Sequence, residues 1–292
     1  MIGKLKLDGL DLSQVEPLVQ LAIREDIGTG DVTSASVVPR EALARGRFIL
    51  NESGIIAGLP VVPVIFRNID VEVEFVPLLQ EGSWLERGTA VAEIVGAAAS
   101  ILTGERLALN FLQRLSGIAT LTSRFVAAVN HTPARILDTR KTTPGWRCLE
   151  KYAVRIGGGM NHRIGLFDRV LIKDNHLKLS SHQPITDAVR RGRANCPAGT
   201  LIEVEAECLE QVREALDARA DIIMLDNMTV EGITEAVKMI RSTPAAPVIE
   251  ASGRVTLGNV RAIAETGVDW ISVGELTHSA KALDIRLDLE PV

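Results

Sequence analysis

Aromatic side chains are scarce in this chain of 292 residues, where they make up 3% of the composition. Aliphatic side chains must therefore fill most of the interior, and stacking of bases on aromatic rings is excluded as a main mode of binding. Basic residues do not dominate either, because 32 Lys and Arg face 37 Asp and Glu, a net charge of −5. Since nucleic acids bind to basic faces, we expect no nucleic-acid partner.

Cysteines and long apolar runs are also few. The three cysteines, Cys148, Cys196 and Cys208, form no CxxC pair and cannot all pair within one chain. This pattern favours buried free thiols in a reducing compartment. No apolar run reaches the ~18 residues that cross a bilayer, and the first eight residues lack the apolar stretch of a secretion signal. We therefore expect a cytoplasmic protein that does not contact a membrane.

The N-terminal part mixes helix and strand patterns. Ser13-Gln14-Val15-Glu16 predicts a capping box that opens a helix, with Pro17 in its first turn. Helical spacing of apolar residues returns from Gly104 onward. Between them lie three strand-like pieces: Arg47–Asn51, Val71–Val76 and Ala90–Val95.

Six short apolar runs follow the long helix, each trailed by polar residues and a helix-like segment. They are Arg135–Asp138, Arg169–Ile172, Leu201–Val204, Asp221–Leu225, Pro247–Ile249 and Val268–Val273. Strands that alternate with helices predict a parallel sheet, and a sheet of this length readily closes into a barrel. Because eight strands are usual in such barrels, we expect a smaller or partly open one of about six strands. The fold class is α/β.

Polar residues stand where these runs end, which is where parallel barrels carry their chemistry. Strand alternation places Glu203 and Glu205 on one face, an expensive arrangement unless a cation shares the space. Lys173 or a bound Mg²⁺ could supply that charge. Glu203 is equally compatible with an internal ion pair, whereas Glu205 and Asp226, nearer their strand ends, favour contact with a metal or a hydroxyl group.

The stretch from Arg140 to Lys173 is strongly basic, with eight Lys and Arg against two acidic residues. A charge run is often only a solvated helix face, and Arg155 and Arg169 are compatible with that. The same stretch, however, holds Gly157–Gly159 and several threonines, which suit close approach to an anion. We therefore predict a phosphate or carboxylate site here.

Two later turns predict a second anion site. Ser252-Gly253 and the segment from Gly274 each join a strand end to a helix start, where free backbone N–H groups suit a phosphate. Ordinary helix caps are the alternative reading of these turns.

Several motifs, in order along the chain, together resemble one family. They are Glu25-Asp26-Ile27-Gly28-Thr29-Gly30-Asp31-Val32-Thr33, Asp138-Thr139-Arg140-Lys141-Thr142-Thr143-Pro144-Gly145, Leu149–Val154, Gly157–Arg163, Lys173-Asp174-Asn175-His176, Leu225-Asp226-Asn227, Glu250-Ala251-Ser252-Gly253 and Leu276-Thr277-His278-Ser279. The pattern resembles quinolinate phosphoribosyltransferase, the decarboxylating enzyme of NAD biosynthesis.

The resemblance implies an enzyme that joins quinolinate to phosphoribosyl pyrophosphate with Mg²⁺, giving nicotinate mononucleotide, pyrophosphate and CO₂. It further implies an N-terminal α/β sandwich domain (1–115, rejoined by 277–292) and a barrel domain (116–276). The assembly it implies is a homodimer with a shared active site, or a higher oligomer, in which the neighbouring sandwich covers each barrel mouth.

The resemblance also assigns roles to single residues. It assigns the binding of the quinolinate carboxylates to five residues: Arg106 of the neighbouring chain, Arg140, His162, Arg163 and Lys173. Lys141 is similar to the lysine at the reacting groups, Glu205 and Asp226 to catalytic acids near the ribose hydroxyls and Mg²⁺, and Ser252, Gly253 and Gly274 to loops that hold the 5-phosphate. Three positions depart from the family pattern: Trp146, Ala206 and Arg254, the last where a second glycine is common.

Three alternatives remain open at this stage. A barrel lyase or aldolase would use Lys141 or Lys173 as a Schiff-base amine. A relative with the same architecture, such as the molybdenum-transport-associated proteins that resemble this family, would run another reaction. A non-catalytic anion-binding protein would bind the ligands without turnover.

Overall fold

The computed structural model describes residues 6–7, 10–179 and 184–292. The chain divides into two compact units. The first takes in the described residues of 1–123 with 142–158 and 279–292, and the second takes in 124–141 and the described residues of 159–278. The barrel domain implied by the family resemblance, residues 116–276, includes residues 142–158, whereas in the structure these residues pack within the first unit.

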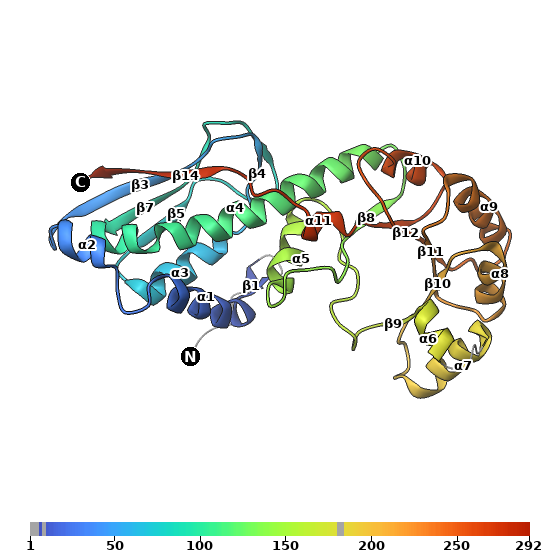
Figure 1. Cartoon of the computed structure of the whole chain (residues 1–292). Helices are drawn as coiled ribbons and strands as arrows, with labels where there is room; N and C mark the ends of the chain where they lie inside the picture. Colours follow the sequence, from blue (N-terminus) through green and yellow to red (C-terminus); the bar gives the residue numbers. More distant parts are fainter. Residues whose placement is uncertain (1–5, 8–9, 180–183) are drawn as a thin grey trace. The chain divides into compact units, whose positions relative to one another are not determined.

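An antiparallel sheet forms the centre of the first unit, in the order β14 (Ile285–Pro291), β3 (Leu43–Leu50), β7 (Ala90–Ala97) and β5 (Glu74–Pro77). Figure 1 shows the C-terminal strand β14 lying beside β3, with Ile285 opposite Leu50. Ala44, Gly46, Phe48 and Leu50 are buried in alternation along β3, so one face of this sheet is its core side. Two short antiparallel pairs complete the unit: β1 (Lys6–Leu7) with β2 (Leu10–Asp11), and β4 (Gly54–Ile55) with β6 (Trp84–Leu85).

The first helix, α1 (Leu12–Asp26), begins earlier than the sequence pattern predicted. Asp11, not Ser13, caps it: its carboxylate accepts the backbone N–H of Ser13 at 3.0 Å and the Ser13 hydroxyl at 2.6 Å. A carboxylate at this position also interacts favourably with the helix dipole, so it displaces serine as the cap. Pro17 consequently lies inside the helix, beyond its first turn.

Helices α2 (Val32–Val37), α3 (Val62–Ile69), α4 (Ala98–Val129) and α5 (Arg147–Ile156) follow, with a 3-10 turn at Leu59–Val61. The long helix α4 starts at Ala98 and runs through Gly104, where the periodic pattern had predicted its beginning. A Cβ at Gly104 would lie 2.5 Å from Phe66 Cε1. The glycine therefore permits close packing of α4 on α3, which offsets its poor helix propensity.

Six parallel strands form the sheet of the second unit, and all six predicted runs are confirmed. The strands are β8 (Arg135–Leu137), β9 (Val170–Ile172), β10 (Ile202–Ala206), β11 (Ile222–Asp226), β12 (Val248–Ser252) and β13 (Trp270–Ser272). Their order is β8-β13-β12-β11-β10-β9. Among the described strands the pairing ends at β8 and at β9, so the barrel is partly open, as expected. Met160 forms a parallel bridge with Leu137 along the edge of β8.

Helices α6 (Asp174–Leu179), α7 (Ile185–Asn195), α8 (Leu209–Asp217), α9 (Val230–Arg241), α10 (Val260–Glu265) and α11 (Glu275–His278) lie between and after these strands. Figure 1 shows α7 to α10 on the outer side of the sheet. Ile202 faces α7, because a Cβ on Gly192 would lie 3.0 Å from its side chain. Alternation then turns Glu203 and Glu205 to the inner face.

All three cysteines are free, as expected, but burial was predicted wrongly for Cys208, which is exposed. Cys148 and Cys196 are half-buried, and burial raises the pKa of the Cys148 thiol. In the described part of the chain, none of the helices combines the length and apolar character of a membrane span.

Candidate active site

Two carboxylates lie at the carboxyl ends of neighbouring strands on the inner face of the sheet. Glu205 ends near Asp226, and Lys173 at the end of β9 forms an ion pair with Glu205. Burial raises the pKa of Glu205, the Lys173 ammonium opposes that rise, and the charges of Asp226 and Glu203 add to it. The predicted pairing of Lys173 with a strand carboxylate is therefore confirmed for Glu205.

The donor set at this point fits a magnesium ion. Carboxylate oxygens are the ligands that Mg²⁺ prefers, and Glu205 and Asp226 offer them from adjacent strands. Burial raises the pKa of Glu205, and the charges of Asp226 and Glu203 add to the rise, so a divalent cation bound here would favour the ionised carboxylate.

The loop after β12 packs directly on the loop after β11. Gly253 has φ of +94°, and a Cβ there would lie 2.4 Å from Asn227 Oδ1. Only glycine satisfies both demands. Ser252 stands opposite Asp226 in the register, so the predicted phosphate turn lies beside the carboxylates. Arg254 is exposed and has φ of +50°, a conformation that favours glycine.

Lys141 lies against the turn that follows β13. A Cβ on Gly274 would lie 3.0 Å from Lys141 Cδ and 3.1 Å from His278 Nε2. The Thr277 hydroxyl donates to the backbone oxygen of Lys141 at 2.8 Å. These contacts bring the predicted lysine and the second predicted phosphate turn together, and they leave the Lys141 side chain exposed.

Arg140 follows the edge strand β8, and Arg163 lies in the segment that leads to the other edge strand, β9. Burial lowers the pKa of the Arg163 guanidinium, and the positive charge of Arg140 lowers it further. The Arg163 side chain is fixed by donation to the backbone oxygen of Arg169 at 3.0 Å. An anion bound near these two guanidinium groups would offset the burial of Arg163 and the positive charge of Arg140. Arg163 also borders a cavity of about 290 Å³ whose lining includes Arg169, Leu171 and His176.

Asp138, buried at the end of β8, holds the segment that carries Arg163. Its carboxylate accepts the Asn161 amide at 2.5 Å and the backbone N–H of His162 at 2.9 Å. Beyond Arg163, Asp168 accepts the backbone N–H groups of Ile164 and Gly165. The segment is therefore anchored on both sides of Arg163.

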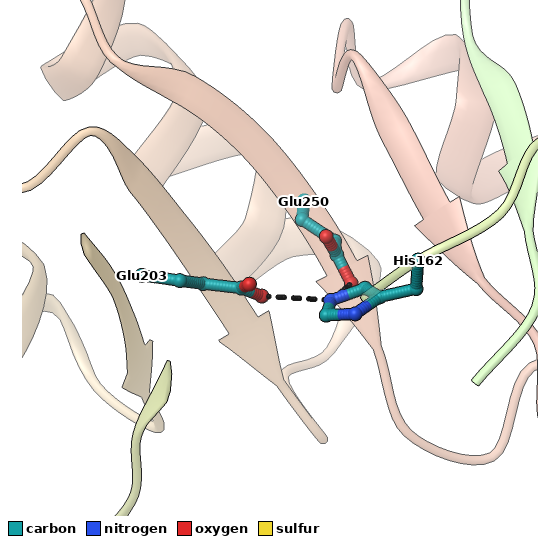
Figure 2. Close-up of side chains that lie close together, drawn as sticks. All are labelled: His162, Glu203 and Glu250. Carbon is teal, nitrogen blue, oxygen red and sulfur yellow. Dashed lines mark hydrogen bonds and ion pairs between the residues drawn. The ribbon is translucent and has the colours of Figure 1, made fainter. Parts of the chain in front are cut away.

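Deeper in the barrel, His162, Glu203 and Glu250 face one another (Figure 2). His162 Nε2 lies 3.2 Å from Glu203 Oε1 and 3.5 Å from Glu250 Oε1, and the three side chains are almost fully buried. Arg169 Nη1 contacts Glu203 Oε2 at 3.1 Å. Glu203 therefore makes the internal ion pair that was one of its two predicted roles, with Arg169 as the cation.

Glu250 was not predicted as a site residue. The available signal was its place in the middle of the apolar run Pro247–Ala251, where a carboxylate needs an unusual partner. Its register partners are Met224 and Trp270, so it faces the same interior as Glu205.

The basic stretch from Arg140 to Lys173 is divided between the two units. Its eight Lys and Arg therefore do not form the single local surplus of positive charge that the sequence predicted. Arg147, Lys151 and Arg155 lie on α5 in the first unit, where Arg155 is exposed. The other five lie in the second unit: Arg140, Lys141, Arg163, Arg169 and Lys173. The reading of Arg169 as a solvated residue is wrong, because it pairs with Glu203 inside the barrel.

Arg106 and Glu150 belong to the first unit. Arg106 is exposed on α4.

Glu150 is fully buried and accepts from Arg114 at 2.8 Å and from the Thr143 hydroxyl at 2.9 Å, so it fixes the start of the loop that leads into α5. Trp146 in this loop stacks on Phe111 with ring centroids 4.7 Å apart, which explains its departure from the family pattern as packing.

Two sequence families match the chain. The family described as quinolinate phosphoribosyl transferase, N-terminal domain, matches residues 31–116, and its C-terminal domain counterpart matches residues 118–288. A probable carboxylating nicotinate-nucleotide pyrophosphorylase of Synechocystis is 46% identical over 94% of this chain and 92% of its own length. A protein of the same description from Bacillus subtilis is 44% identical over 94% of this chain and 93% of its own length. The crystal structure of NadC from Streptococcus pyogenes covers 97% of this chain and 99% of its own, with a TM-score of 0.91 and 39% identity.

Proposed function

The chain belongs to the quinolinate phosphoribosyltransferase family, and we propose that the inner face of its second unit is where the family's reaction takes place. The protein joins quinolinate to phosphoribosyl pyrophosphate and releases pyrophosphate and CO₂, leaving nicotinate mononucleotide. The observation that supports the proposed location is the ion pair of Lys173 with Glu205 beside Asp226 at the strand ends. Glu203 acts on Glu205 and also on Arg163, whose other charged neighbours include Arg140.

Charge is the main obstacle that such a site overcomes. Phosphoribosyl pyrophosphate carries roughly five negative charges and quinolinate about two, so the substrates repel each other until cations intervene. In the proposal, Arg140, Arg163 and Lys173 bind the two quinolinate carboxylates. Arg106 of the neighbouring chain completes that set, and His162 belongs to the same segment as Arg163.

The phosphoribosyl pyrophosphate lies along the next strands. Glu205 and Asp226 hold the ribose hydroxyls together with Mg²⁺, which would neutralise charge on the departing pyrophosphate when bound. Lys141 faces the reacting groups from the turn at Gly274. Ser252-Gly253 and Gly274 offer backbone N–H groups to the 5-phosphate.

The chemistry requires no covalent enzyme intermediate. Pyrophosphate leaves first, which gives the ribose oxocarbenium character, and the pyridine nitrogen attacks that carbon. The ring nitrogen then carries a positive charge, which stabilises the ylide left when the adjacent 2-carboxylate departs as CO₂. The electron pair left on that ring carbon takes up a proton from water, which gives nicotinate mononucleotide. Positioning by the arginines and electrostatic stabilisation by Lys141 supply the catalysis.

The proposal includes the homodimer with a shared active site that the family resemblance implies. Arg106, exposed on the first unit, would be the residue that the neighbouring chain contributes. It also places the protein in the cytoplasm, in keeping with three free cysteines.

The direct test is incubation with quinolinate, phosphoribosyl pyrophosphate and Mg²⁺, followed by detection of nicotinate mononucleotide. Nicotinate, which lacks the second carboxylate, is expected to give no product because cations of the site are left unpaired. Turnover of nicotinate at a comparable rate would refute the carboxylate assignment. Borohydride trapping of a carbonyl adduct on Lys141 or Lys173 would instead support a lyase, and binding without turnover would support an anion-binding protein.

A further inference from the structure

The two ring nitrogens of His162 face different groups. The backbone N–H of Arg163 donates to Nδ1 at 2.7 Å, while Nε2 lies 3.2 Å from a Glu203 oxygen. An N–H group donates only to a nitrogen that carries no proton, so Nδ1 is bare. The ring proton then lies on Nε2 and is donated to Glu203. These contacts favour the tautomer of His162 that carries its proton on Nε2.

Both oxygens of Glu203 meet donors inside the barrel. One oxygen accepts from His162 and the other from the Arg169 guanidinium at 3.1 Å, and the side chain is fully buried. Arg169 itself lies over the Trp270 ring, 5.5 Å from its centroid. Because the guanidinium is always charged, Glu203 and Arg169 balance each other inside the barrel.

Glu250 has few partners that would stabilise a negative charge. Its Oε1 accepts from the Ser272 hydroxyl at 2.5 Å, and its buried Oε2 meets no hydrogen-bond partner in the described part of the chain. Burial raises the pKa of Glu250 well above its ordinary value, and the nearby charge of Glu203 raises it further. The other charges that face it are Arg169 and, from β10, Glu205.

We propose that Glu203 is a positioning residue for substrate binding: it fixes His162 as the neutral Nε2–H tautomer, whose bare Nδ1 in turn fixes the backbone of Arg163. The inference rests on the proposed function, in which Arg163 binds a quinolinate carboxylate. Asp138 holds the His162 backbone N–H as well, so the segment is fixed through both its main chain and its ring. His162 therefore acts through Arg163 and adds no positive charge to the site.

A matched pair of variants tests the two glutamates, because each exchange replaces one carboxyl oxygen by an amide group. Glu203→Gln removes a required anion, so the KM for quinolinate should rise about tenfold or more, the effect of losing a charge-assisted hydrogen bond. The KM for phosphoribosyl pyrophosphate should stay unchanged. Glu250→Gln imitates a neutral carboxyl group and should leave both constants near the wild-type values. Glu231→Gln, on the exposed first turn of α9, is the control for the exchange itself.

Either an unchanged quinolinate KM in Glu203→Gln or an equal loss in Glu250→Gln would overturn the proposal. A rise in the KM for quinolinate alone indicates a positioning role. General damage to the fold would change the KM for both substrates. If wild-type protein forms no nicotinate mononucleotide, the proposed function fails, and the tautomer is then decided by the measurement below.

Nitrogen-15 NMR of the wild-type protein with labelled histidine reads the tautomer without any substitution at the glutamates. His162→Gln assigns the signal among the five histidines of the chain. We expect a bare Nδ1 and a protonated Nε2 at neutral pH, unchanged by added Zn²⁺. A doubly protonated ring, a proton on Nδ1, or loss of the Nε2 proton on adding Zn²⁺ would each overturn the proposal, the last by making the cluster a metal site.

Discussion

Asp138 accepts the backbone N–H of His162 at 2.9 Å and so joins the end of β8 to the segment that presents Arg163. The Asn161 amide reaches the other oxygen of the same carboxylate at 2.5 Å. Asp138 is fully buried, and this one segment supplies a donor to each of its two carboxylate oxygens. The strand end and the proposed substrate segment therefore depend on each other.

Asp138→Ala should loosen that segment. The variant leaves the His162 N–H without its acceptor and should lower the free energy of unfolding by about 2 kcal/mol. The KM for quinolinate should rise more than the KM for phosphoribosyl pyrophosphate. Asp138→Asn keeps one acceptor oxygen and is the control, expected to lie between wild type and Asp138→Ala. Chemical denaturation and steady-state kinetics provide the two measurements.

Gly253→Ala should harm both stability and phosphoribosyl pyrophosphate binding. Its φ of +94° strains any other residue, and the new Cβ would overlap Asn227. Gly88→Ala is the matched control, since φ is +87° there and open space surrounds the Cβ position. The control should cost about 1–2 kcal/mol from backbone strain alone. Equal thermal shifts for the two variants would mean that the contact with Asn227 is unimportant.

The pH dependence of stability should report Glu250. Its pKa is raised in the folded protein by burial and by Glu203. The neutral carboxyl group therefore stabilises the fold fully below the ordinary glutamate pKa, and this contribution is lost as pH rises through the folded value. Glu250→Gln cannot ionise, so it should gain stability relative to wild type as pH increases. Parallel curves for the two proteins from pH 4 to 9 would contradict this account.

Magnesium dependence should trace to Glu205 and Asp226. We expect chelation with EDTA to abolish turnover and added Mg²⁺ to restore it. Glu205→Gln and Asp226→Asn should each raise the Mg²⁺ concentration needed for half-maximal activity, because each removes a charged ligand. Glu207→Gln, exposed just beyond β10, serves as the control. Full activity in EDTA would remove the ion from the proposal.

Subunit mixing should test the shared active site. Arg106→Ala and Lys141→Ala should each inactivate the protein, since one removes a cation given by the neighbour and the other a cation of the site itself. After exchange of subunits, some mixed dimers hold one intact site, so partial activity should return. If activity stays absent after exchange has been demonstrated with tagged chains, Arg106 does not act across chains.

Much of the second unit could be predicted from sequence because its signals are local. Apolar runs such as Asp221–Leu225 specify buried strands, and alternation alone places Glu203 and Glu205 on one face. Because Lys173 stands at a strand end, it could be predicted as a cation for these carboxylates, and in the structure it pairs with Glu205.

The rest depended on contacts between distant residues. The cap of α1 moved to Asp11 because its carboxylate competes successfully with the capping pattern of Ser13. Residues 142–158 pack with the first unit although they directly follow the barrel strand β8 and its loop in the sequence. The hydrogen bond between Arg114 and Glu150 helps to fix them there. Nor can a local pattern show that Glu250 meets Glu203 and His162 across the barrel.

The bridge between Leu137 and Met160 gives the segment that we propose to bind quinolinate a second, structural role. An edge strand with free N–H and C=O groups is a template on which other chains aggregate. Met160 and its neighbours shield the border of β8 from such pairing. Substitutions that detach Met160 from β8 would therefore make the protein more prone to aggregate, in addition to any loss of activity.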